Sequence, residues 1–292
     1  MRNALNPHMK RLIAVLGLVL LSASLGSCGS SQAKPPIPPP TSGPVKTTNN
    51  TGYRTPALHG PQPRNPDMTL GADFAKGPRL AFSRVAVRDK YIAITFDDGP
   101  HPQNTPRLLD MLRARNIKAT FYMVGSNADA YPQVVRRVVA EGHEIGNHSY
   151  THRLFSKMSD ADIRQELSRT RDAIVRAAGV QPRTLRPPYG GMLQRQREWV
   201  NAEFGYPIIL WSVDPLDWRR PGASVVCSRI LKSTTAGGIV LVHDLHSQTV
   251  DAMPATLDGL LQRGFKFVTV SQLLAMQAEP ATAHTTAGLT AY

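Results

Sequence analysis

Residues 91–100 read YIAITFDDGP, a short β-rich run followed by two acids and a Gly-Pro turn. An apolar run of this length, bounded by a turn and lacking polar alternation, is typical of a strand buried on both faces of a parallel sheet. The two acids then fall where this strand ends and the next loop begins. The same arrangement, a strand followed by polar residues, recurs along the chain after it.

Strand and helix alternate from here to about residue 270. Strands are expected at 91–96, 119–124, 143–147, 184–186, 207–212, 238–242 and 265–270, with an outer strand within 79–88. Helices are expected at 105–115, 132–140, 159–178, 193–204, 223–233 and 253–263, with a last short helix capped by Ser271. Ser159, with Asp162 three residues further on, resembles a capping box at the start of the longest of these helices. Seven strand–helix repeats predict an α/β fold with parallel strands, closed or nearly closed into a barrel.

The first 27 residues resemble an export signal. Arg2, Lys10 and Arg11 precede an apolar run at 12–21, which is too short to span a membrane. The segment then ends in Leu-Gly-Ser before Cys28, which resembles a bacterial lipoprotein box. We therefore expect residues 1–27 to be a signal peptide and Cys28 to carry a diacylglyceryl membrane anchor. The alternative is an ordinary secretory signal, and both interpretations export the protein.

Residues 28–78 have the composition of a tether. Ten prolines lie between Cys28 and Pro66, among many Ser, Thr and Asn. Such a segment buries too little apolar surface to offset the entropy of ordering, so we expect it to be disordered or polyproline-like. The domain itself is expected at 79–277, followed by a flexible small-residue tail at 278–292.

Charge and cysteine content exclude several classes of protein. The 292 residues carry a formal charge of +13 but only two cysteines, Cys28 and Cys227, which excludes a disulfide framework and a Cys-rich zinc site. Much of the excess positive charge lies before residue 91, since residues 28–90 contain nine Lys and Arg against three acids. No base-stacking or groove-reading motif is present, so nucleic acid is not an expected partner.

Five polar clusters follow predicted strands. They read TFDDGP at 95–100, NHSYTH at 147–152, RPPYG at 186–190, DPLDW at 214–218 and LVHD at 241–244. In an α/β barrel the carboxyl ends of all strands meet on one face. The five clusters are therefore expected to form one site.

In this order the clusters resemble the five motifs of the polysaccharide deacetylase family, the NodB-like carbohydrate esterases. The resemblance covers about residues 88–272. It implies a distorted (β/α) barrel and metal-dependent hydrolysis of N- or O-acetyl groups on glycans.

The metal site is expected at Asp98, His148 and His152. The two histidines lie four residues apart, so both imidazoles would face one point if the segment turned helically. With the carboxylate that the family supplies at Asp98, they make a two-histidine, one-carboxylate set with open positions. Zinc is the default cation, and cobalt, nickel or iron would suit the same ligands.

The remaining roles are also implied by the resemblance. Asp97 matches the general base, and Arg186 matches the arginine that pairs with it. Tyr189 matches the residue whose backbone N–H helps to hold the oxyanion, a role that does not need its hydroxyl group. Trp218 and Leu241 resemble the groove wall and the acetyl-methyl pocket, although both would equally suit a barrel core.

His243 matches the general acid of the family. A nearby carboxylate would hold its tautomer and raise its pKa. Asp217 is the preferred partner and Asp214 its rival in the same loop, while Asp244 adjoins the histidine and is expected to be structural. His246 would substitute only if this loop differed from the family.

The sequence therefore predicts an exported, metal-dependent hydrolase that removes N-acetyl groups from an acetylated cell-envelope glycan, with peptidoglycan preferred. A chitooligosaccharide deacetylase or an O-acetyl xylan esterase would use the same site. A non-catalytic glycan-binding member would be expected to lack Asp97, a metal ligand or His243, and all of these are present. The sequence does not indicate an oligomeric state.

Overall fold

The strand that follows Lys90 is the centre of the fold. In the structure, a computed structural model that describes residues 79–277, this strand is β2 (Tyr91–Asp97), and every residue in it after Tyr91 is buried. It pairs in parallel with β3 (Thr120–Met123) and β6 (Ile239–His243), while β4 (Glu144–Asn147) extends the sheet beyond β3. The apolar run of the sequence thus becomes a central strand that has neighbours on both sides.

Short strands complete the set. Near its start β2 also pairs with β7 (Lys266–Phe267), and β1 (Ala81–Phe82) pairs with β5 (Ile208–Ile209) in a separate two-stranded sheet. Single-residue bridges link β4 to β5 through Leu185 and join Val213 to β6. The strands therefore close into a distorted ring, and the predicted parallel α/β fold is confirmed.

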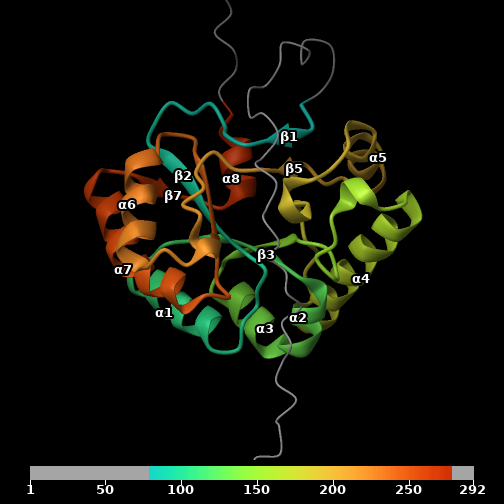
Figure 1. Cartoon of the computed structure of the whole chain (residues 1–292), viewed down its shortest axis with the longest axis horizontal. Coiled ribbons are helices and arrows are strands. Elements are labelled where there is room, and N and C mark those ends of the chain that lie inside the picture. The colour runs from blue at the N-terminus through green and yellow to red at the C-terminus, as the bar shows by residue number, and fades with distance from the viewer. Residues whose placement is uncertain (1–78, 278–292) are drawn as a thin grey trace, which may run out of the picture. The chain divides into compact units, whose positions relative to one another are not determined.

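Helices surround these strands (Figure 1). They are α1 Asn104–Ala114, α2 Gly125–Ala130, α3 Pro132–Ala140, α4 Asp160–Ala178, α5 Gln194–Phe204, α6 Ala223–Ser233, α7 Ser247–Gln262 and α8 Val270–Ala275. The main core lies between their apolar faces and the strands β2, β3 and β6, and it includes Ile94, Phe121, Leu109 and Leu257. None of the helices in this described part of the chain is long and apolar enough to cross a membrane.

The structure differs from the sequence-based expectation in several elements. The strand expected at 184–186 is a single bridging residue, Leu185, and the outer strand expected within 79–88 has only two residues. Helix α2 was not predicted, because its sequence GSNADA has no apolar periodicity. The last helix is capped by Thr269 and not by Ser271, since the Thr269 side chain accepts the N–H of Gln272. Ser271 lies inside that helix and bonds Glu144 instead.

The cap predicted for the longest helix is present. Ser159 accepts the backbone N–H of Asp162 at 3.2 Å, and Gly179 ends α4 in the left-handed region at φ 70°. The predicted signal peptide, tether, Cys28 anchor and C-terminal tail lie outside the described residues.

Candidate active site

Strand register brings the polar clusters to one end of the barrel. Asp97 at the end of β2 lies opposite His243 at the end of β6, and His148 follows the last residue of β4. The cleft at this end is lined by Asp97, Asp98, His148, His152, Pro187, Tyr189, Trp211, Asp214, Trp218, Leu241 and His243. The five sequence clusters thus share one cleft, and Trp211 is a lining residue that the sequence analysis did not identify.

Three side chains of this cleft converge on one point. The Nε2 atoms of His148 and His152 lie 3.3 and 3.2 Å from Asp98 Oδ1, and all three residues are buried. Two ligands that share an ion about 2.1 Å from each have this separation. Burial raises the pKa of Asp98, but the attraction of the neighbouring histidines outweighs it and holds the pKa well below its usual range, so this carboxyl group is ionised.

The protonation of His148 also fits a cation. Its Nδ1 lies 2.6 Å from the carbonyl oxygen of Arg186, which assigns a proton to Nδ1. In the neutral imidazole, the form that binds a metal, Nε2 then carries a lone pair. That lone pair faces Asp98 Oδ1, a buried oxygen that makes no hydrogen bond within the described residues. Lone pairs that face one another in a buried site repel unless a cation lies between them. The residues present therefore fit a divalent metal ion.

The histidine pair does not lie on a helix. From the sequence, a helical turn between His148 and His152 was assumed to bring the two imidazoles together. His148 to His152 form a loop in which Ser149 and His152 have φ values of 62° and 58°. Side chains hold this loop in place. Asn147 accepts the N–H of Ser149 at 3.0 Å, and Ser149 Oγ accepts the N–H of His152 at 2.9 Å. Glu166 of α4 accepts two further N–H groups of the loop, a contact that the sequence did not indicate.

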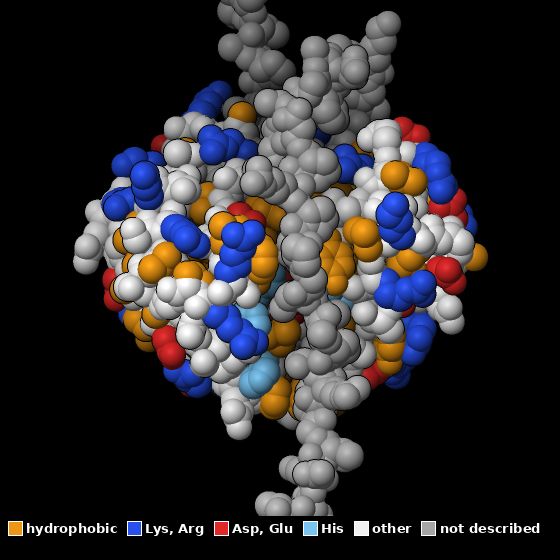
Figure 2. All heavy atoms as spheres, viewed as in Figure 1, with side chains coloured by type: hydrophobic (Ala, Val, Ile, Leu, Met, Phe, Trp, Pro, Cys, Tyr) orange, Lys and Arg blue, Asp and Glu red, His pale blue; other side chains and the backbone are white. Residues whose placement is uncertain are grey.

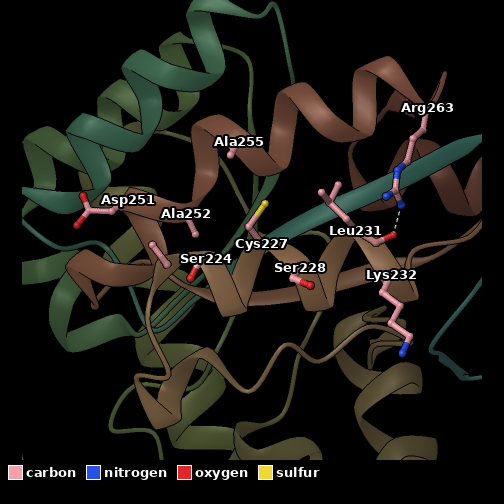
Figure 3. A pocket seen from close by; sticks show the side chains of 10 residues that line it. Ser224, Cys227, Ser228, Leu231, Lys232, Asp251, Ala252, Ala255 and Arg263 are labelled. Atoms are coloured by element: carbon pink, nitrogen blue, oxygen red, sulfur yellow. Dashed lines mark hydrogen bonds between the residues drawn. The ribbon is translucent and has the colours of Figure 1, made fainter.

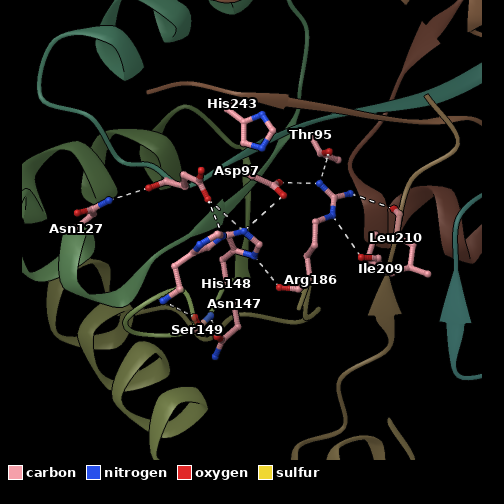
Figure 4. A network of polar contacts seen from close by, with 12 residues as sticks. Thr95, Asp97, Asn127, Asn147, His148, Ser149, Arg186, Ile209, Leu210 and His243 are labelled. Carbon is pink, nitrogen blue, oxygen red and sulfur yellow. Dashed lines mark hydrogen bonds and ion pairs between the residues drawn. The ribbon is translucent and has the colours of Figure 1, made fainter. Parts of the chain in front are cut away.

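Asp98 is held through its backbone as well. It has a left-handed φ of 73°, a conformation that costs a non-glycine residue free energy. Asn127 of α2 donates its side-chain amide to the Asp98 carbonyl oxygen at 2.8 Å. Because α2 was not predicted, this support for the Asp98 turn was missed. Figure 4 shows Asn127 reaching toward this turn.

Arg186 fixes Asp97. Its Nη1 donates to Asp97 Oδ1 at 2.7 Å and to Thr95 Oγ1 at 2.6 Å, and the guanidinium group also reaches the carbonyl oxygens of Ile209 and Leu210 (Figure 4). Arg186 is fully buried, so each of these donors needs an acceptor from the protein. The other carboxylate oxygen of Asp97 lies 3.6 Å from His148 Nε2, and thus beside the candidate metal ligands Asp98, His148 and His152.

Asp217 is the carboxylate that contacts His243. Its Oδ1 lies 2.9 Å from His243 Nδ1, and its Oδ2 accepts the backbone N–H of His243 and the hydroxyl group of Thr249, both at 2.8 Å. Burial lowers the pKa of His243, but Asp217, with added attraction from Asp98 and Asp97, outweighs it and raises the pKa to about 10. The imidazole is therefore held in its protonated form.

The two rival carboxylates have other contacts. Asp214 accepts the N–H of Leu216 within its own loop. Asp244 is buried beneath the Asp98 turn, where a Cβ on Gly99 would clash with it, and it accepts a short hydrogen bond from Thr105. Burial raises the pKa of Asp244 to about 7. His246 directly precedes helix α7.

The residues expected to contact substrate surround this centre. The Tyr189 ring lies 4.7 Å from the His152 ring, and Tyr189 has a φ of 60°, which sets the direction of its backbone N–H. Leu241 is buried beside Thr95 in the β2–β6 register, and Trp218 is partly exposed. Their roles in binding stay predictions.

Two larger hollows lie away from this cleft. One, of about 600 Å³, lies between α6 and α7 and is lined by small and apolar side chains around Cys227 (Figure 3). The other, of about 690 Å³, lies near His143 at the amino end of β4. Neither contains the convergent carboxylates and imidazoles of the cleft, which identifies the smaller cleft as the candidate active site.

The fold and the cleft together define an α/β barrel whose strands carry, at their carboxyl ends, a candidate metal site of two histidines and one aspartate. The sequence matches the family model for polysaccharide deacetylase over residues 84–209. A peptidoglycan-N-acetylglucosamine deacetylase from Bacillus cereus is 37% identical over 192 residues, which make up 64% of this chain and 70% of the relative. The chain belongs to the polysaccharide deacetylase family.

Two further comparisons agree with this assignment. PgdA, a peptidoglycan-N-acetylglucosamine deacetylase of Listeria monocytogenes, is 40% identical over 222 residues, 73% of this chain. The match covers 47% of that relative, so the chain corresponds to about half of its length. The crystal structure of the Bc1960 peptidoglycan N-acetylglucosamine deacetylase superposes with a TM-score of 0.64 at 35% identity, over 68% of this chain and 94% of that one.

Proposed function

We propose that this chain is a metal-dependent hydrolase that removes N-acetyl groups from amino sugars of a cell-envelope polysaccharide, with peptidoglycan as the substrate. The observation that carries the proposal is the cleft itself. Asp98, His148 and His152 converge on one point, Asp97 lies beside them on Arg186, and His243 is held by Asp217. Such a set suits hydrolysis of an acyl bond, since it provides a metal site, a base and an acid.

Asp98, His148 and His152 would hold the cation, and we propose zinc, although cobalt, nickel or iron suits the same donors. When bound, the cation would acidify water and polarise the acetyl carbonyl group. Residues of the chain supply the base and the acid. Arg186 holds Asp97 in place through one carboxylate oxygen, so that the second oxygen is available to take a proton.

His243 then supplies the proton that the leaving amine needs. Asp217 accepts the Nδ1 proton and His243 lines the cleft, so the Nε2 proton is the one left for the substrate, which makes His243 the proposed general acid. A cation at Asp98 would cancel part of the negative charge that raises the pKa of His243, so the proton would be released more readily. The backbone N–H of Tyr189 is the proposed donor to the developing oxyanion.

We further propose that the protein is exported and anchored to the membrane by a lipid on Cys28, with residues 28–78 as a tether that lets the domain at 79–277 reach the wall. The positive start, the short apolar run and the single early cysteine support this part of the proposal. Labelling with a fatty-acid analogue would reveal the lipid, and the label should vanish in a Cys28→Ser variant.

The test of the function is release of acetate from three substrates side by side. Purified peptidoglycan, N-acetylated chitooligosaccharides and acetylated xylan would be compared at equal acetyl concentration. The proposal expects the highest kcat/KM on peptidoglycan. Strong release from xylan with none from peptidoglycan would overturn this order and favour an O-acetyl esterase.

Removal of the metal gives a further prediction. Dialysis against a chelator should reduce acetate release to background, because the acetyl carbonyl group is no longer polarised when the cation is removed from Asp98, His148 and His152. Added zinc should restore it with a stoichiometry of about one ion per chain. A chelated protein that keeps its full rate while bound metal is undetectable by elemental analysis would contradict the proposal.

A further inference from the structure

The loop that follows Val213 is rigid. Leu216 and Arg220 both have left-handed φ values, 56° and 54°, and the backbone N–H of Arg220 bonds the carbonyl oxygen of Asp217 at 2.8 Å. Arg229 of α6 donates to the carbonyl oxygen of Pro215 at 2.8 Å. Asp217 is tied to His243 in turn, so the loop is locked to the candidate general acid.

This rigid loop presents two exposed arginines beside the cleft. Arg219 and Arg220 directly follow Trp218, a cleft-lining residue, and the Arg219 guanidinium carbon lies 4.7 Å from the centre of the Trp218 ring. Stacking of this kind leaves the N–H groups at the edge of the guanidinium plane available to an acceptor. Arg219 is thereby held beside the cleft-lining Trp218, and Arg220 is the next residue of the same turn.

Neither arginine is neutralised by an acid of the described residues. Nine other arginines of the described residues, including Arg164 and Arg195 on the outer helices, form ion pairs with aspartate or glutamate. Arg219 and Arg220 form none within residues 79–277, although they are adjacent and repel each other. In the view of Figure 2, Lys and Arg side chains lie on both flanks of the domain, and hydrophobic and histidine side chains are visible between them.

Two unpaired guanidinium groups on a preorganised turn suit a carboxylate, which arginine binds through paired N–H groups. We propose that Arg219 and Arg220 form a carboxylate subsite that selects anionic glycans over neutral ones. This proposal rests on the proposed deacetylation and names the part of the substrate that the cleft recognises. A peptidoglycan strand offers two sources of carboxylate. One is the peptide stem, and the other is the lactyl group of a muramic acid from which the stem has been removed, because an attached stem holds that carboxyl group in an amide bond.

The exposed Asp214 opposes this attraction, because it lies in the same loop and lines the same cleft. One of its oxygens is occupied by the N–H of Leu216. Two guanidinium groups against one carboxylate still leave a net positive charge on the loop. The attraction to an anionic substrate should therefore weaken with salt, as expected for exposed charges.

The test compares the R219Q/R220Q double variant with the wild-type protein, both loaded with zinc. Acetate release is measured on a neutral chitooligosaccharide, on peptidoglycan fragments with stems, and on the same fragments after an amidase has removed the stems. We expect the ratio of kcat/KM on stem-bearing fragments to that on the neutral substrate to fall by about tenfold, mostly through KM.

The third substrate separates the two sources of carboxylate. If the stem is recognised, its removal lowers the selectivity of the wild-type protein to that of the double variant. If the lactyl carboxylate is recognised, the selectivity of the wild-type protein appears or rises when the amidase frees that carboxylate, and this gain is absent in the double variant. Equal losses on neutral and anionic substrates, or no loss on either, would overturn the proposal.

A matched control removes the same charge elsewhere. The R84Q/R88Q double variant changes two exposed arginines that precede β2, at the end of the strand opposite to the cleft, and it should keep the wild-type selectivity. Calorimetric titration of the fragments provides a readout that does not need turnover. If no acetate is released from any substrate but binding still depends on Arg219 and Arg220 and on salt, the proposed function fails while this inference stands.

Discussion

The Asp97→Asn variant is expected to keep its metal and to lose about 10²–10⁴-fold in kcat. Asp97 is not one of the three converging ligands, so the Asp98, His148 and His152 cluster stays intact. The amide that replaces the carboxylate still accepts from Arg186 but can no longer take a proton. Elemental analysis together with steady-state kinetics would measure the two effects separately.

The same variant should also be less stable. Arg186 is fully buried and keeps its positive charge when its anionic partner is lost. Thr95 and two backbone carbonyl oxygens still accept its hydrogen bonds, so we expect the free energy of unfolding to fall by about 1–3 kcal/mol. Denaturant titration of the metal-free protein would measure this loss.

A matched change separates base from ligand. Asp98→Asn should weaken metal binding as well as turnover, since Asp98 Oδ1 faces both histidines. If Asp97→Asn lost the metal and Asp98→Asn kept it, the two acids would have been assigned the wrong way round. Full activity in Asp97→Asn would remove the proposed base altogether.

The second large effect is expected for Asp217→Asn, with a loss of about 10²-fold or more in kcat. Asp217 raises the pKa of His243 to about 10 against burial, which lowers it. Without that carboxylate, burial prevails and the imidazole loses its proton at lower pH. The high-pH limb of the kcat profile should therefore move down by at least about one pH unit.

The same interaction makes stability depend on pH. His243 has a higher pKa in the folded protein, about 10, than the usual value of 6.5, so the folded state binds more protons between these values. The stability that this proton contributes is present below pH 6.5 and is lost as the pH rises toward 10. Metal-free wild-type protein should lose stability across this window more steeply than metal-free Asp217→Asn.

Thr249→Val serves as the control for Asp217→Asn. It removes one hydrogen bond to Asp217 and leaves the carboxylate and its contact with His243 in place. A small decrease in kcat without a shifted pH profile is expected. If Thr249→Val moved the high-pH limb as far as Asp217→Asn does, the charge of Asp217 would not be the cause.

The family and the fold class were both predicted correctly from local patterns. Apolar runs such as 91–96 can be buried only as central strands, and the five motifs follow such runs at their carboxyl ends. Helix α4 was recognisable from its Ser159 cap. These features depend on neighbours in the sequence, so the sequence alone was enough to find them.

Elements without a local pattern were missed or overestimated. Leu185 was expected to belong to a strand, but only tertiary bridges to Asn147 and Ile208 give it a place in the ring. Helix α2 has neither apolar periodicity nor a side-chain cap, and its role is visible only where Asn127 reaches the Asp98 turn. The condition of a helical turn between His148 and His152 was wrong, because Asn147, Ser149 and Glu166 hold that loop in another shape.

Residue types and their order along the chain were sufficient to predict a parallel α/β barrel of the deacetylase family and to name the candidates for its metal site, base and acid. Only the folded chain shows that Asp217, and not Asp214 or Asp244, contacts His243, and that Arg219 and Arg220 lie unpaired beside the cleft. The reason is physical. A strand or a helix cap depends on residues that are close in sequence. Which of three nearby carboxylates contacts His243 depends on differences of a few ångströms between side chains that only the tertiary structure brings together.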